Sequence, residues 1–174
     1  MTMSANNPDS DIIRFTQRLH NFRNVMARLE EALDITSPSD TERAGIIQFY
    51  EMAFELAWKG LKDYLQWQGL DPKSPRDTIK TGIRMDVLTD GDSWMQALTD
   101  RNLTVHTYDE EAAMAVEQSI RTTYYPLLKD LAGFFEKQAE DLEQARGRQR
   151  PSGGDRNDND RQTGGTHPGP SKKQ

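Results

Sequence analysis

The sequence predicts an all-α protein, an up-and-down antiparallel bundle of four to five helices. Apolar residues recur at spacings of three and four through three long stretches of the chain. No segment rich in Val, Ile and Thr alternates with polar residues as a strand would. Clusters of Gly, Pro, Ser and Asp separate the helical stretches and supply signals for helix starts and ends. A chain of 174 residues allows one domain, or one domain with a tail.

The first helix is predicted from Asp11 to Leu33. Its apolar side chains follow each other at spacings of 4, 3, 4, 3 and 4 residues, which places them in one stripe along a helix. Such a stripe needs a partner surface, so a bundle is favoured over an isolated helix. The stripe consists of Phe15, Leu19, Phe22, Met26, Leu29 and Leu33.

The second helix is predicted from Asp40 to about Gln68. Ser39, with Glu42 three residues later, forms a capping-box pattern at its start, and Gly69 is a natural stop. Its apolar residues cover more of its circumference than one stripe would. A helix of this kind is central in a bundle, or faces its own core on one side and a second subunit on the other. We therefore expect a homodimer.

A shorter third helix is predicted after Ser74, which would cap it, with Pro75 at its first position. A turn at residues 89–92 then precedes a fourth helix, for which Asp92 or Ser93 would be the cap.

The last helix is predicted to begin at residues 109–111, where three acidic side chains suit a helix N-terminus. Pro126 lies inside its apolar pattern. Because the pattern resumes at Leu127, we expect a kink at the proline and not the end of the helix.

Composition and charge divide the chain into a body and a tail. Residues 1–146 hold 16 Lys and Arg against 25 Asp and Glu, whereas residues 147–174 hold 6 against 3. The second part has no aliphatic or aromatic residue, so we expect a disordered tail at 147–174, a helical domain at 11–146 and a flexible N-terminus at 1–10. The acidic body argues against broad nonspecific binding to nucleic acid, although a small local basic site remains open.

Several classes of protein are disfavoured by composition. The chain has no cysteine, which excludes disulfides and thiolate zinc sites. No apolar run approaches the roughly 18 residues that cross a bilayer, and the N-terminus has no signal-peptide core. We therefore expect a cytoplasmic protein that makes no membrane contact.

The segment from Arg101 to Tyr108 concentrates the chemistry. An arginine stays charged and can direct two donors at a phosphate, and a histidine such as His106 can exchange a proton near neutral pH. Arg101 and His106, without metal ligands, could cleave RNA: the imidazole would activate a 2′-hydroxyl and the guanidinium would stabilise charge on the phosphorane. The alternative is that Arg101, Asn102 and His106 only cap carbonyls and form salt bridges, and that Tyr108 packs.

Sequence motifs in the chain resemble those of the HEPN toxins of HEPN–MNT toxin–antitoxin systems, the branch called nucleotidyltransferase substrate-binding proteins. The resemblance covers roughly residues 13–142, in order. It is carried by Arg101-(x)4-His106-x-Tyr108, by 54–65 in the second helix, by Ser74-Pro75-Arg76-Asp77, by 100–109 and by Tyr125-Pro126.

This resemblance implies a HEPN-like bundle that dimerises and brings two Arg/His motifs into one cleft. It implies a metal-independent ribonuclease in which Arg101 and His106 are catalytic and Asn102 supports them. The partner would be a small MNT nucleotidyltransferase, which uses its own ATP and Mg²⁺ to transfer AMP to Tyr108 and so inactivate the toxin. No cofactor or metal of this chain's own is implied.

Two further hypotheses stay open. The chain could be a non-catalytic subunit that presents substrate or nucleotide to the nucleotidyltransferase, which the acidic charge mildly favours. It could also be a helical dimer with a structural role only. In both cases His106 would be dispensable.

Overall fold

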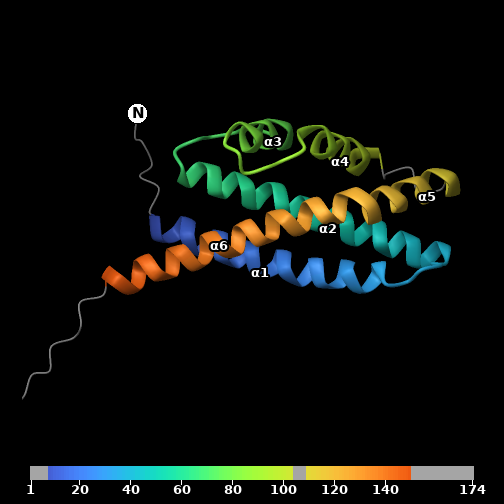
Figure 1. Ribbon diagram of the computed structural model, residues 1–174, viewed down its shortest axis with the longest axis horizontal. Coiled ribbons are helices and arrows are strands. Elements are labelled where there is room, and N and C mark those ends of the chain that lie inside the picture. The colour runs from blue at the N-terminus through green and yellow to red at the C-terminus, as the bar shows by residue number, and fades with distance from the viewer. Residues whose placement is uncertain (1–7, 104–108, 150–174) are drawn as a thin grey trace, which may run out of the picture.

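The computed structural model describes residues 8–103 and 109–149 and contains no β-strand in these ranges. The elements of this part of the chain are α1 (Pro8–Leu33), α2 (Asp40–Trp67), α3 (Pro75–Arg84), α4 (Gly91–Leu103), α5 (Glu110–Ser119), the π-helical turn η2 (Ile120–Tyr124) and α6 (Tyr125–Gln149). Since α5, η2 and α6 follow without a break, they form one long rod (Figure 1). The predicted all-α bundle is confirmed.

The helix α2 is the centre of the bundle. It contacts each of the other five α-helices, with α1 and α6 on one side and the shorter α3 and α4 on the other (Figure 1). Nine of its residues are buried, and one of them, Gly60, lets α6 approach closely, because a Cβ there would lie 2.9 Å from the Phe135 ring. Within one chain, α2 therefore has the central position that the sequence allowed, and its predicted contact with a second subunit stays a prediction.

Local sequence signals explain where most helices begin. The Ser39–Glu42 capping box is formed in both directions, and Ser74 caps α3 with Pro75 at its first position. Asp109 caps α5 by accepting the amide of Glu111 at 3.1 Å.

The helix α4 begins earlier than the sequence indicated. Neither Asp92 nor Ser93 is its cap; instead, the carboxylate of Asp90 accepts the amide of Ser93 at 3.2 Å. Gly91 is the first helical residue, and it lies against Ile83 at a spacing that a Cβ would violate. Contact with α3 therefore sets the start of α4.

The ends of the outer helices extend past the predicted limits. The first helix α1 begins at Pro8 and not at Asp11, and α6 continues to Gln149, past the domain boundary placed after Arg146. Helix elongation adds one hydrogen bond for each residue fixed, so a packed helix can continue beyond its last core contact.

The irregularity expected at Pro126 takes the form of the π turn η2 directly before it. The amide of Tyr125 donates to the carbonyl of Ile120, five residues back. Proline has no N–H, and its ring crowds the carbonyl four residues earlier; the wider turn relieves this crowding while the rod continues. In the part of the chain that the structure describes, no helix has the length and apolar character needed to cross a membrane.

Candidate functional site: an arginine at the end of α4

Arg101 lies in the last turn of α4 and reaches back to α2. Its Nη2 is 2.8 Å from the Oε2 of Glu55, and its Nη1 donates to the Oδ1 of Asn102 at 3.2 Å. The guanidinium is thus oriented by a carboxylate, and 34% of the side chain is exposed.

Glu55 connects this arginine to two further donors. It accepts the indole Nε1 of Trp58 at 2.9 Å and pairs with the Nζ of Lys59 at 2.6 Å. Burial alone would raise the pKa of Glu55, but the hydrogen bonds from Lys59 and Trp58 and the charges of Lys59 and Arg101 outweigh it and hold the pKa below its ordinary value. Glu55 is therefore an anion at neutral pH, which keeps Arg101 paired and in place.

Sequence reasoning did not identify Glu55 as a site residue. Its signal was a single acid in the apolar run of α2 between Met52 and Trp58, where a carboxylate needs a partner. Periodicity could place Glu55 on a helix face but could not name Arg101, 46 residues later, as the partner.

The structure describes two of the four predicted site residues, and their roles stay predictions. Arg101 and Asn102 are adjacent in space, and the Asn102 amide oxygen accepts from the guanidinium. His106 and Tyr108 lie outside the described residues, so their predicted approach to Arg101 stays a prediction. The segment that holds them connects Leu103, at the end of α4, to Asp109, the cap of α5.

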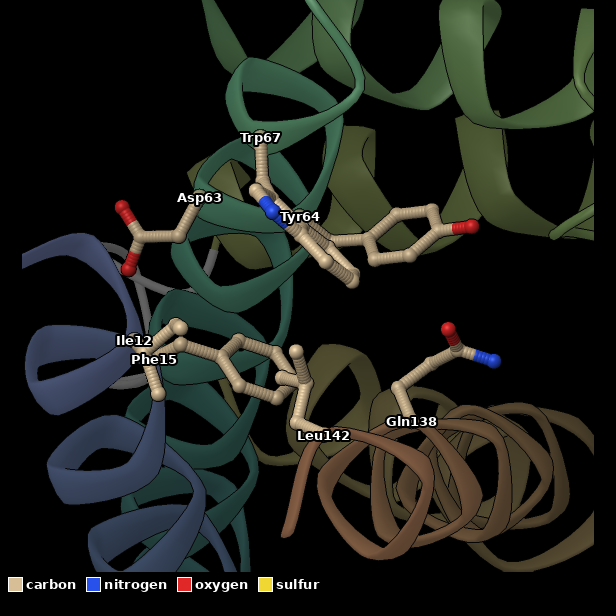
Figure 2. Close-up of a pocket in the computed structure, with 7 residues that line it drawn as sticks. All are labelled: Ile12, Phe15, Asp63, Tyr64, Trp67, Gln138 and Leu142. Carbon is tan, nitrogen blue, oxygen red and sulfur yellow. The ribbon is translucent and has the colours of Figure 1, made fainter. Parts of the chain in front are cut away.

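A small pocket, with room for about one water molecule, lies elsewhere, between α1, the end of α2 and the end of α6 (Figure 2). It is lined by Ile12, Phe15, Asp63, Tyr64, Trp67, Gln138 and Leu142. Its one carboxylate, Asp63, points away from the aromatic rings and pairs with Arg18 at 3.0 Å. Along α2 this cavity is about 12 Å or more from Glu55. Because few polar groups converge on it, the cavity is a weaker candidate site than Arg101.

None of the described residues form a cluster of three or more His, Asp or Glu side chains that could hold a metal ion. The chemistry that the described part of the site offers is therefore that of a cation: a fixed guanidinium that can bind an anionic oxygen.

The fold and this arginine define the class as a helical-bundle protein with a carboxylate-paired arginine at one helix end. The structure is similar to a crystal structure of a protein from Thermus thermophilus, with a TM-score of 0.62 and 32% identity, over 66% of this chain and 98% of that chain.

Two comparisons of sequence assign the chain to a family. The chain is 35% identical over 86 residues to a protein of Haemophilus influenzae named "Probable ribonuclease HepT". The match covers 47% of this chain and 59% of that relative's length. The family model described as nucleotidyltransferase substrate binding protein like matches residues 17–137, so the chain belongs to this family of HEPN toxins, as the motifs indicated.

Proposed function

We propose that the protein is an endoribonuclease toxin of the HEPN type, with Arg101 and His106 as its catalytic residues. The observation that carries the proposal is the Arg101 guanidinium, held by Glu55 at the end of α4, directly before the segment that contains His106. The ribonuclease name of the Haemophilus influenzae relative supports the same activity. The site of action would be the cytoplasm, as the sequence led us to expect.

The chemistry proposed for this site is transfer of the phosphoryl group to the neighbouring 2′-oxygen. His106 takes the proton of the 2′-hydroxyl, the 2′-oxygen attacks phosphorus, and the bond to the 5′-oxygen breaks. The products are a 2′,3′-cyclic phosphate and a 5′-hydroxyl. Arg101 stabilises the charge that builds on the phosphorane oxygens. No cofactor or metal is needed for any of these steps.

Proton delivery gives a chemical reason for a dimer. In an in-line displacement the attacking and departing oxygens lie on opposite sides of phosphorus, so one imidazole cannot serve both at once. A second copy would contribute the His106 that protonates the 5′-oxygen. The homodimer is thus part of the proposed mechanism.

The helix α3 offers the local basic surface that an acidic RNA-binding protein needs. Arg76, Lys80 and Arg84 are exposed at four-residue spacing, on the side of α3 about 180° from its buried residues. In the described part of the chain, none of these three has a carboxylate within salt-bridge distance. Like charges at this spacing destabilise a helix, so the stripe suits contacts to an RNA backbone.

Inhibition by an MNT nucleotidyltransferase is the regulatory half of the proposal. The phenol oxygen of Tyr108 would attack the α-phosphorus of ATP held with Mg²⁺ by the partner, pyrophosphate would leave, and the phenol proton would pass to a base of that enzyme. The added phosphodiester would then bind Arg101 in place of the RNA phosphate.

A cleavage assay with EDTA present tests the ribonuclease. The wild type should release products with cyclic phosphate ends, whereas Arg101→Ala and His106→Ala should each be slower by about 10² or more. Tyr108→Phe should cleave like the wild type but gain no AMP mass when co-expressed with the neighbouring nucleotidyltransferase. Equal cleavage rates for the wild type and His106→Ala would show that His106 is not the catalytic base.

The second candidate is a non-catalytic subunit that presents substrate to the nucleotidyltransferase. The acidic body and the family description favour it. It would be preferred if no RNA is cleaved and the partner's activity depends on adding this chain.

A further inference from the structure

Two stacked tyrosines bind the last turns of α4. Tyr50 of α2 and Tyr124 at the end of η2 have ring centroids 5.4 Å apart and planes 22° apart, and both are buried. The Tyr50 hydroxyl donates to the carbonyl of Ala97 at 2.7 Å. The Tyr124 hydroxyl donates to the carboxylate of Asp100, the residue directly before Arg101.

The Asp100 carboxylate is held on both oxygens. The Gln96 amide donates to its Oδ1 at 2.8 Å, and Tyr124 donates to its Oδ2. The backbone of α4 is therefore tied to α2 at Ala97 and to the long rod at Asp100. These ties fix the point from which the Arg101 side chain extends to Glu55.

Packing alone does not account for the two hydroxyls. A phenylalanine would fill nearly the same space without the cost of removing a hydroxyl from water, which is offset only when the group is hydrogen-bonded. Burial raises the pKa of Tyr124, and its hydrogen bond to Asp100 raises it further, so the phenol remains a donor throughout the neutral range.

Tyr124 and its neighbour Tyr125 leave the rod in different directions, as consecutive helical residues do. The Tyr124 hydroxyl donates to Asp100 of α4, whereas burial and the nearby carboxylate of Glu30 on α1 raise the pKa of the Tyr125 phenol. Both tyrosines lie near a carboxylate and start from the same place in the rod, but Tyr124 is buried and Tyr125 only partly buried. Tyr125 is therefore a neighbouring control for loss of a tyrosine hydroxyl that does not contact α4.

We propose that Tyr50 and Tyr124 are positioning residues for Arg101: their hydroxyls hold the last turns of α4 so that the guanidinium stays in the geometry that the reaction uses. This inference rests on the proposed ribonuclease. It adds two residues that touch neither the RNA nor the reacting atoms and act through Asp100 and Ala97. A misplaced catalytic group loses rate because the reacting geometry is reached less often.

The test compares Tyr124→Phe with Tyr125→Phe. Tyr124→Phe should lower kcat for RNA cleavage by about tenfold or more and leave KM within about twofold, while Tyr125→Phe changes neither. Amide hydrogen exchange should quicken at residues 97–103 in Tyr124→Phe only. Asp100→Asn, which keeps an acceptor oxygen for Tyr124, should retain more activity than Asp100→Ala.

Each outcome decides between the two proposals. If Tyr124→Phe and Tyr125→Phe change kcat and exchange equally, the tyrosine pair only packs and the positioning role is wrong. If the wild type cleaves no RNA, the proposed ribonuclease function is wrong. Faster amide hydrogen exchange at residues 97–103 in Tyr124→Phe, but not in Tyr125→Phe, would still show that Tyr124 orders α4. Should Tyr124→Phe fail to fold, Tyr50→Phe gives the same comparison through Ala97.

Discussion

In the proposed reaction, Arg101 stabilises a phosphorane only while its guanidinium stays oriented, and Glu55 pairs with that guanidinium at 2.8 Å. We predict that Glu55→Gln lowers kcat/KM for RNA by about tenfold, because a neutral amide holds the guanidinium less firmly. Steady-state cleavage rates check this, with the exposed Glu140→Gln as the control for charge removal. A rate equal to that of the wild type would show that Arg101 needs no carboxylate.

The same residue predicts a dependence of stability on pH. Because the pKa of Glu55 in the folded protein is below its ordinary value of 4.5, its ionised form stabilises the fold above about pH 4.5. This contribution is lost as the pH falls through the folded-state pKa. Urea unfolding from pH 7 to pH 3 should therefore show a smaller acid loss in Glu55→Gln than in the wild type. If the free energy of unfolding falls equally with pH in the two proteins, the pKa of Glu55 is not lowered by folding.

For single residues, the sequence indicates which side chains could be reactive better than it indicates which residues they contact. It selected Arg101 and Asn102 by residue type and by motif, and in the structure the Arg101 guanidinium donates to the Asn102 amide oxygen, while their roles stay predictions. It gave no role to Glu55 or Tyr124, because their partners lie 46 and 24 residues away on other helices. Only tertiary packing brings such pairs together, and a single sequence contains no direct measure of it.

Among the elements, α5 and η2 are joined to the α1–α2 connection by a buried carboxylate. Glu117 is 8% exposed and lies between Arg43, at 2.8 Å, and Arg121, at 2.7 Å. Arg121 also donates to the carbonyl of Ile35 at 2.7 Å. Removing Glu117 takes a carboxylate from both arginines and leaves Arg43 paired with the exposed Asp40 at 2.9 Å.

We predict that Glu117→Ala lowers the free energy of unfolding by about 3 kcal/mol or more, as expected when one partner of a buried ion pair is removed. Urea denaturation measures this, and the exposed Glu140→Ala should change stability by less than about 0.5 kcal/mol. A small effect at Glu117 would mean that solvent reaches the two arginines.

The basic stripe of α3 gives a prediction for the element as a whole. The triple change Arg76→Gln, Lys80→Gln and Arg84→Gln should weaken binding of single-stranded RNA and reduce its salt dependence. The log–log slope should fall by about 0.7 for each phosphate that the variant no longer neutralises. Binding titrations at several salt concentrations check this.

The matched control for α3 removes three exposed cations elsewhere, at Arg28, Lys137 and Arg148. Net charge changes equally in both triple variants. If both triple variants lower the affinity for RNA and the salt slope to the same degree, RNA binding depends on the overall charge of the protein and not on α3.

Element boundaries followed the sequence where a local signal sets them and departed from it where packing does. Ser39, Ser74 and Asp109 form their caps with neighbours in sequence, so their motifs were sufficient. The start of α4 depends on contact with Ile83, a residue of another helix. A proline predicts an irregularity, but whether the chain kinks or forms a π turn depends on what the rod packs against.

For the whole molecule, the structure changes the reason to expect a dimer. The sequence based it on the wide apolar surface of α2, but contacts with the chain's own helices bury much of that surface. Exposed apolar side chains on α2 remain at Met52 and Trp67, which are 42% and 43% exposed. The stronger reason to expect two copies is now the proposed reaction, which needs an acid and a base on opposite sides of phosphorus.

A dimeric enzyme should be sensitive to inactive copies of itself. We predict that the wild type sediments at micromolar concentration with twice the 19.9 kDa mass of the chain. Adding an excess of His106→Ala protein should lower cleavage below that of the wild type alone, because mixed dimers hold only one imidazole. Added Glu140→Gln protein, which keeps both catalytic residues, should raise the rate. If cleavage instead follows wild-type concentration whatever is added, one chain suffices, and both proton transfers must pass through a single His106 or through water.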